Sequence, residues 1–220
     1  EKSILDQASG ALLFIDLENF KLINDSSGHA CGDSLIADVA RQLAMAVGSS
    51  HILARIGGDE FVVVLTNTNR QAFIQAYAQR LINLFNPPFT CQGHQYYLSA
   101  SIGIAFFPKD GNGLDDLLRK ADTALHVAKA TGRSAYRFFE QSMQDSVLEK
   151  IALENRLRAA VKNKEQFHMR YQPQVDAQTG MLVGMEALMR WCCPERGFIS
   201  QLLFIPVAEE TGLINELGDW

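Results

Sequence analysis

The sequence predicts an α/β fold of the mixed α+β type, in which helices flank one central sheet. Short apolar runs alternate along the chain with longer segments whose apolar residues recur at helical spacing. An adjacent glycine pair, Gly57-Gly58, separates two of the apolar runs, as expected for a hairpin turn that needs positive φ angles. The hydrophobic fraction of 47% is enough to build a core around such a sheet.

The same patterns predict where each element lies. The expected strands are 11–17, 51–56, 61–65, 96–106 and 135–139. The expected helices are a first turn within 19–27, a second helix opened by Gly32-Asp33, and the segments 68–85, 114–131 and 141–162. Pro87-Pro88 and Gly132 supply the stop signals for the helices that precede them.

The length of 220 residues fits one large domain, or one medium domain and a fragment. We expect a first domain over 1–140, a linker helix over 141–165 and a second segment over 166–220, because turn signals become frequent after Phe167. The net charge of −5 argues against nucleic acid and anionic membranes as partners. The four cysteines include no C-x-x-C pair, which favours a reduced, cytoplasmic setting, and no stretch reads as a membrane span.

Three carboxylates occupy positions that suit a metal site. Asp16 ends the first expected strand, and Asp59 and Glu60 follow the glycine pair at the hairpin. If these strands are neighbours, the three acids converge at one end of the sheet, where Mg²⁺ would share its shell with substrate phosphates. The alternative is that the acids are merely solvated, as most surface acids are.

Three sequence blocks resemble the GGDEF family of diguanylate cyclases. Residues 57–61 read GGDEF, residues 16–35 read DLENFKLINDSSGHACGDSL, and residues 121–133 read ADTALHVAKATGR. The three blocks stand in the order that the family has. The resemblance implies a nucleotide-cyclase-like mixed sheet and a reaction in which two GTP molecules form cyclic-di-GMP and two pyrophosphates.

The resemblance also implies a role for each matching residue. Asp16, Asp59, Glu60 and the carbonyl of Leu17 would hold Mg²⁺ or Mn²⁺. Asn24 and Asp33 would recognise guanine, while Asp59, Glu60, Lys129 and Arg133 would form the catalytic set. The GTP-binding set would be Asn24, His29, Asp33, Gly57, Gly58, Lys129 and Arg133.

Structural roles compete with some of these assignments. Asn24 and Asp33 suit helix caps and turns. Lys129 and Arg133 suit the negative end of a helix dipole. Glu18, His126 and Ser134 replace the family's usual Asp, Tyr and Asn, and the family's segment before the first strand is missing here, so the chain reads as truncated at both ends.

The last part of the chain resembles the opening of an EAL-type phosphodiesterase domain. The residues that carry the likeness are Tyr171-Gln172-Pro173, Glu186-Ala187-Leu188 with Arg190, and the run from Phe204 to Ile214. Glu186 would be a metal ligand, and Gln172, Leu188 and Arg190 would contact the dinucleotide. A (β/α)₈ barrel needs about 250 residues, so we expect only an incomplete barrel fragment without phosphodiesterase activity.

Two alternatives to a working cyclase stay open. The first domain is either a catalyst, which needs a homodimer because one domain offers one GTP site, or a GTP-binding regulatory module that controls the EAL phosphodiesterase. A purely structural dimerisation domain is the third reading. Expected partners are GTP and cyclic-di-GMP, with no nucleic acid and no membrane contact by this segment, although a membrane anchor upstream stays compatible with the sequence.

Overall fold

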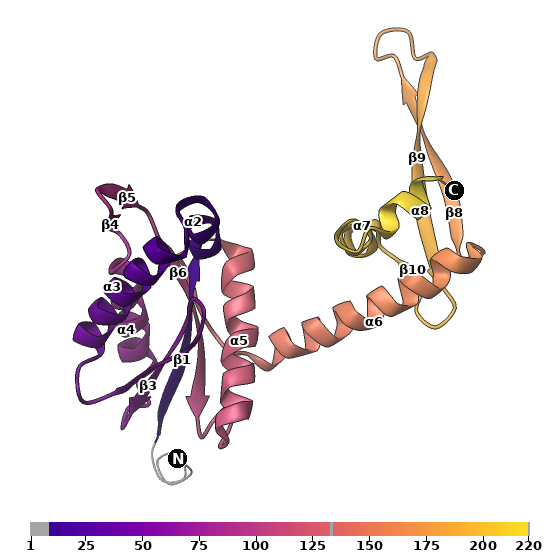
Figure 1. Ribbon diagram of the computed structural model, residues 1–220. Helices are drawn as coiled ribbons and strands as arrows, with labels where there is room; N and C mark the ends of the chain where they lie inside the picture. Colours follow the sequence, from indigo (N-terminus) through magenta and orange to yellow (C-terminus); the bar gives the residue numbers. More distant parts are fainter. Residues whose placement is uncertain (1–8, 133, 220) are drawn as a thin grey trace. The chain divides into compact units, whose positions relative to one another are not determined.

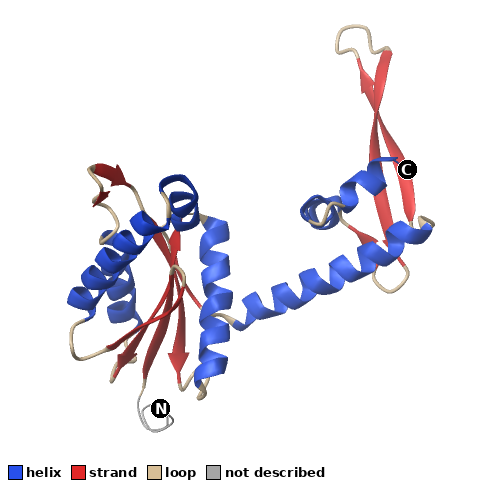
Figure 2. Cartoon of the chain, in the orientation of Figure 1, coloured by secondary structure: helices blue, strands red, loops and turns tan. Residues whose placement is uncertain are grey.

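The computed structural model describes residues 9–132 and 134–219. Five strands form the main sheet in the order β2-β3-β1-β6-β7. They are β1 (Gly10–Glu18), β2 (Ile52–Gly57), β3 (Glu60–Thr66), β6 (Ser99–Phe107) and β7 (Tyr136–Phe138). All neighbours are antiparallel except β6 and β7, which are parallel. The predicted fold class, a mixed sheet flanked by helices, is therefore confirmed (Figure 2).

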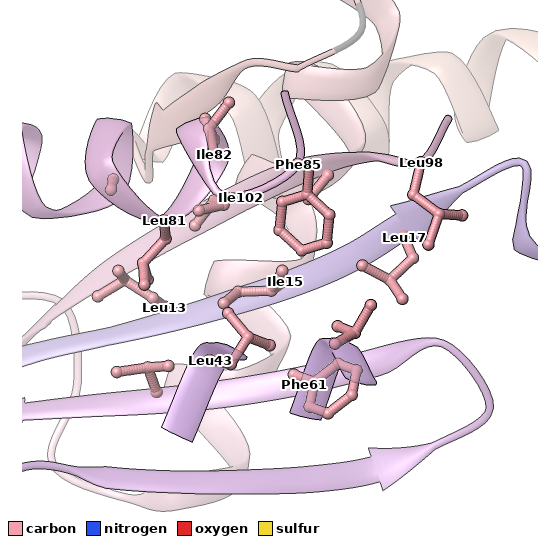
Figure 3. Close-up of a cluster of buried hydrophobic side chains, with 14 of the residues drawn as sticks. Leu13, Ile15, Leu17, Leu43, Phe61, Leu81, Ile82, Phe85, Leu98 and Ile102 are labelled. Carbon is pink, nitrogen blue, oxygen red and sulfur yellow. The ribbon is translucent and has the colours of Figure 1, made fainter. Parts of the chain in front are cut away.

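Helices cover both faces of this sheet (Figure 1). They are α2 (Phe20–Ser27), α3 (His29–Val47), α4 (Gln71–Asn83) and α5 (Leu114–Thr131). Successive strand residues point to opposite faces, so β1 divides its side chains between two cores. Leu13, Ile15 and Leu17 join the core under α3 and α4 (Figure 3), whereas Leu12 and Phe14 join the core under α5. By the same alternation, the even-numbered acids at the end of β1 continue the α5 side.

A glycine allows α5 to lie close to the sheet. A Cβ atom on Gly103 of β6 would come within 1.8 Å of the carbonyl oxygen of Ala121 and within 2.4 Å of the amide nitrogen of Leu125. Backbone in both positions cannot move aside cheaply, so Gly103 is required for this approach. The close packing carries the end of α5 to the same edge of the sheet as Asp16.

The predicted hairpin between β2 and β3 is present, but its turn lies one residue later than the glycine pair, since Gly57 ends β2. Gly57 pairs with Glu60, so Gly58 and Asp59 make a two-residue turn. Gly58 has φ +51°, the left-handed region that glycine adopts without strain. The turn places Asp59 and Glu60 at the end of β3 that lies beside the end of β1.

Three predicted boundaries differ from the structure. The strand expected over 96–106 is two strands: β6, and β5 (His94–Tyr96), which pairs with β4 (Phe89–Cys91) in a separate small sheet. The second helix begins at His29 rather than at Gly32-Asp33, because Gly28, with φ +81°, ends α2 and accepts the first bonds of α3. Helix α4 is shorter than the 68–85 expected.

The chain forms two compact units, of which the first ends at Gln144 and the second begins at Asp145. The second unit contains most of α6 (Gln141–Asn163), the strands β8 (Phe167–Val175), β9 (Leu182–Cys193) and β10 (Gly197–Ile199), and the helices α7 (Gln201–Glu210) and α8 (Leu213–Asp219). Its three strands form a sheet in the order β10-β9-β8. Trp191, fully buried, contacts Phe167 and Phe204 at the centre of its core. The domain limits predicted from the sequence stay a prediction.

None of the helices within residues 9–132 and 134–219 is long and apolar enough to span a bilayer.

Candidate active site at the ends of β1 and β3

Asp16 and Glu60 face each other across two neighbouring strands. They are directly paired in the antiparallel register of β1 and β3, so their side chains project from the same face of the sheet. On the other side of β1, Asp16 is paired with Ser101 of β6. The amide of Leu17 donates to the carbonyl of Asp59 at 3.2 Å, which fixes the hairpin turn against the end of β1.

Lys129 reaches this group from α5. Its Nζ atom lies 2.7 Å from Oδ1 of Asp16, and the residue stands in the last turn of the helix. The Asp16 side chain is 14% exposed and the Lys129 side chain 37% exposed, so the pair lies at the wall of the site. In this ion pair the Asp16 carboxylate is nearly buried and fixed in place, whereas the partly exposed Lys129 side chain is flexible.

Crowding of acids shifts two of the carboxyl groups. Burial raises the pKa of Asp16 above its usual value, although the ion pair with Lys129 opposes the shift. Burial also raises the pKa of Glu60, and the negative charges of Asp16, Asp59 and Asp122 add to that effect. Carboxyl groups whose pKa is raised because their ionised form is disfavoured are typical of functional sites.

Asp122 was missed by the sequence analysis as a member of this group. It lies on α5 seven residues before Lys129, which is two helical turns and therefore the same face. Its charge raises the pKa of Glu60. The helical spacing of Asp122 and Lys129 was the available signal, but only the packing of α5 on β1 and β6 makes it meaningful.

Glu18, the departure from the family's Asp, has its own partners. Its two carboxylate oxygens accept hydrogen bonds from the hydroxyls of Ser101, at 2.5 Å, and Ser99, at 3.1 Å. Ser101 is fully buried. The longer side chain of Glu reaches across to β6, so in this structure Glu18 braces the end of β1 beside Asp16.

Arg55 holds the hairpin turn. Its guanidinium donates to the carbonyl of Gly58 through Nε at 3.0 Å and Nη2 at 2.7 Å. The two bonds span a point where the β2-β3 register shifts, between Arg55 and Gly57. Arg55 therefore ties the irregular end of β2 to the turn that carries Asp59.

Asn24, His29 and Asp33 lie around the junction of α2 and α3. Asn24 is inside α2, and its side-chain oxygen lies only 1.7 Å from the position that a Cβ atom on Gly32 would take. His29 and Asp33 are exposed on the first turns of α3. Neither Asn24 nor Asp33 is the N-cap of its helix, since Asn19 and Gly28 hold those positions. The capping alternative is thus wrong for both.

The donor set fits Mg²⁺ better as a shared site than as a closed protein cage. Within the described part of the chain, no three His, Cys, Asp or Glu side chains are arranged to hold a metal ion by themselves. Asp16 and Glu60 nonetheless present hard oxygen ligands on one face of the sheet. Mg²⁺ usually takes only one or two carboxylates and completes its shell with water and substrate phosphates.

Of the other predicted residues, Gly57 and Gly58 lie at the exposed hairpin, where backbone is open to a ligand. Arg133 lies outside the described residues.

The sequence and this geometry agree with a known family: residues 2–135 match "Diguanylate cyclase, GGDEF domain". The chain belongs to the GGDEF diguanylate cyclase family. Residues 154–220 match the EAL domain family.

Relatives of this GGDEF–EAL chain support the assignment. It is 40% identical over 220 residues to the bifunctional diguanylate cyclase/cyclic di-GMP phosphodiesterase MucR of Pseudomonas aeruginosa, covering all of this chain and 32% of MucR. It is 40% identical over 215 residues to the cyclic di-GMP phosphodiesterase PdeR of Escherichia coli, covering 98% of this chain and 32% of PdeR. The chain thus spans about a third of the length of these curated relatives.

A solved structure gives the same result for the fold. An EAL/GGDEF domain protein from M. capsulatus is 41% identical, with a TM-score of 0.58, over 61% of this chain and 87% of that one.

The EAL-type residues gather on one face of the ribbon formed by β8 and β9. Gln172 is paired directly with Glu186, and Leu188 and Arg190 follow at alternate positions along β9. Arg190 donates to the side-chain oxygen of Gln201 at 2.7 Å, at the start of α7. Gln172 and Glu186 are exposed. The four residues predicted from the EAL resemblance therefore share a face, which alternation along the strands explains.

Proposed function

We propose that the GGDEF unit is a diguanylate cyclase that condenses two GTP molecules into cyclic-di-GMP with a divalent cation, Mg²⁺ or Mn²⁺. The observation that carries the proposal is the pairing of Asp16 with Glu60 beside a cationic Lys129. This arrangement offers oxygen ligands to a metal and an ammonium group to phosphates within one small site.

Each residue has a distinct task in this proposal. Asp16, Asp59, Glu60 and the carbonyl of Leu17 hold the cation, which when bound polarises the α-phosphate and neutralises the charge of the leaving pyrophosphate. Lys129 and Arg133 bind the β- and γ-phosphates, and the turn at Gly57 and Gly58 lets the backbone approach them. His29 shapes the phosphate end of the turn before α3.

Guanine is read by Asn24 and Asp33. A carboxylate accepts hydrogen bonds from guanine N1–H and the exocyclic amine, and the Asn24 amide donates and accepts. Asp33 is exposed on α3, and the Asn24 side chain lies against Gly32, the residue immediately before Asp33. A base placed over the junction of α2 and α3 would meet both side chains.

Turnover requires two copies of the domain. Each domain supplies one GTP, and the 3′-hydroxyl of one attacks the α-phosphate of the other. Asp59 or Glu60 takes the proton of that hydroxyl. We place the protein in the cytoplasm, with GTP and cyclic-di-GMP as its ligands and neither nucleic acid nor membrane as a partner of this segment.

A second function has its own support. PdeR, a relative of similar identity, is named a phosphodiesterase. A GGDEF unit that binds GTP without turnover and controls EAL activity would use the same guanine and phosphate contacts. The two functions differ only in whether product forms.

The deciding experiment incubates the full-length protein with GTP and Mg²⁺ at concentrations that favour dimers, and separates the nucleotides by chromatography. We expect cyclic-di-GMP from the wild type and none from Asp16→Asn or Glu60→Gln. Wild-type protein that binds GTP and leaves it unchanged would establish the regulatory function instead. Glu140→Gln, at an exposed acid beyond β7, is the matched control.

A further inference from the structure

We propose that Lys129 is a latch on the cation site: it occupies Asp16 when nucleotide is absent and transfers to the phosphates when nucleotide binds. Divalent cation and nucleoside triphosphate would then bind cooperatively, each removing an obstacle to the other. The inference rests on the proposed function, because it assigns the cation to Asp16 and the triphosphate to Lys129.

The ion pair between Lys129 and Asp16 occupies the carboxylate that the cation would need. Lys129 Nζ is 2.7 Å from Asp16 Oδ1, the distance of a charge-assisted hydrogen bond. A divalent ion at Asp16 would meet a positive charge already held by the same carboxylate. The cation therefore binds weakly until Lys129 leaves, since like charges at such separations repel strongly in a partly buried site.

Binding of the phosphates is hindered by the negative charge of the carboxylates. Asp59 acts electrostatically on Asp16, and Asp16, Asp59 and Asp122 act on Glu60 at this end of the sheet. The positive charge of Lys129 acts on both Asp16 and Glu60. A triphosphate that arrives without a metal would thus approach an acidic surface where Lys129 is already bound to Asp16.

Both obstacles vanish when the two ligands arrive together. The charges of Asp16 and Glu60 would be neutralised by a bound metal, and the released Lys129 ammonium would pair with the phosphates. The lysine can make this exchange because its side chain is partly exposed and has a long flexible stem, while Asp16 is held in β1. Reciprocity follows from linkage: if nucleotide raises cation affinity by some factor, the cation raises nucleotide affinity by the same factor.

The test measures Mn²⁺ binding by electron paramagnetic resonance, with and without the α,β-methylene analogue of GTP, which keeps the triphosphate and cannot react. We expect Lys129→Met to bind Mn²⁺ alone more tightly than the wild type, by a factor in the range of roughly 5–150 typical of such coupling. The same variant should bind the analogue more weakly, and the analogue should raise its Mn²⁺ affinity by a smaller factor than in the wild type.

Two controls separate the possible outcomes. Lys162→Met removes one positive charge from α6 in the second unit and should leave Mn²⁺ binding unchanged. Lys129→Arg keeps the charge and should restore the wild-type weakness toward Mn²⁺ alone. Unchanged Mn²⁺ affinity in Lys129→Met, or tighter binding with undiminished coupling, overturns the latch. Mn²⁺ binding that is as tight in Asp16→Asn as in the wild type would instead refute the assignment of the cation to Asp16, and with it the proposed function.

Discussion

Asp16 and Glu60 are a directly opposed cross-strand pair, and burial raises the pKa of both carboxyl groups. Like charges opposite each other on neighbouring strands destabilise a sheet. At the ends of β1 and β3, Lys129 supplies a counter-charge through its ion pair with Asp16. Such a site is less stable without ligand than with it, because a bound cation would relieve the repulsion.

The first prediction is that Glu60→Gln stabilises the ligand-free GGDEF unit at neutral pH. A carboxyl group whose pKa is raised on folding makes the folded state less stable as pH rises from its unfolded pKa through its folded pKa. The neutral amide removes this loss. After allowance for solvent screening we expect about 0.5–1 kcal/mol, seen as slower hydrogen–deuterium exchange of amides in β1 and β3.

The pH dependence supplies the control for this variant. Below roughly pH 4 the wild-type Glu60 is itself protonated, so the difference in exchange should disappear there. Trp191, in the core of the second unit, reports any unrelated change by its fluorescence. If Glu60→Gln exchanges faster than the wild type at neutral pH, Glu60 makes a net stabilising contact and the prediction fails.

The second prediction concerns Arg55, whose two bonds to the Gly58 carbonyl fix the turn that carries Asp59. Arg55→Met removes both bonds and should weaken the turn by about 0.5–1 kcal/mol, since the contact is exposed. We expect faster amide exchange at residues 58–60 and weaker binding of GTP with Mg²⁺. Arg55→Lys, which lacks the planar fork, should recover only part of both.

Arg41→Met is the matched control, because Arg41 forms an exposed ion pair with Asp38 on α3, away from the hairpin. It should leave exchange at the turn and GTP binding unchanged. If Arg55→Met binds GTP as the wild type does while the turn exchanges faster, Arg55 has a structural role only.

Local signals predicted the parts of this fold that depend on local chemistry. The glycine pair indicated the two-residue turn, because Gly58 takes a left-handed φ that few other residues accept. The apolar run 11–17 indicated β1, whose residues are almost all buried. The end of α5 followed from Gly132, whose φ is +143°.

Contacts between distant segments were beyond such signals. Nothing near Lys129 in the sequence indicates that Gly103 lets α5 approach β6 and thereby brings Lys129 to Asp16. Glu18 stood out only as a longer acid than the family's Asp, because its partners Ser99 and Ser101 lie more than 80 residues away. The strand expected over 96–106 was divided because β5 pairs with β4, which propensity alone did not reveal.

The third prediction is that the 220-residue chain does not hydrolyse cyclic-di-GMP with Mg²⁺ or Mn²⁺. Glu186 and Gln172 are exposed on the β8-β9 ribbon, and the described strands of the second unit form a three-stranded sheet and not a closed barrel. Chromatography of cyclic-di-GMP after incubation provides the measurement, with an active EAL enzyme as the positive control. Hydrolysis that is lost in Glu186→Ala would contradict the prediction.

The last prediction separates guanine recognition from stability at Gly32. A Cβ there would lie 1.7 Å from Oδ1 of Asn24, which is the end of a flexible side chain and can rotate away. Alanine inside α3 favours the helix by about 1 kcal/mol. Gly32→Ala should therefore keep or raise stability while weakening GTP binding, by roughly 1–3 kcal/mol if guanine N–H groups lose their partners.

Calorimetric titration should show a smaller loss of affinity for ATP than for GTP. Asp33→Ala should show the same difference, and Ser34→Ala, exposed on the same helix, should bind both nucleotides as the wild type does. Equal losses for both nucleotides would mean that Asn24 and Asp33 do not read the base.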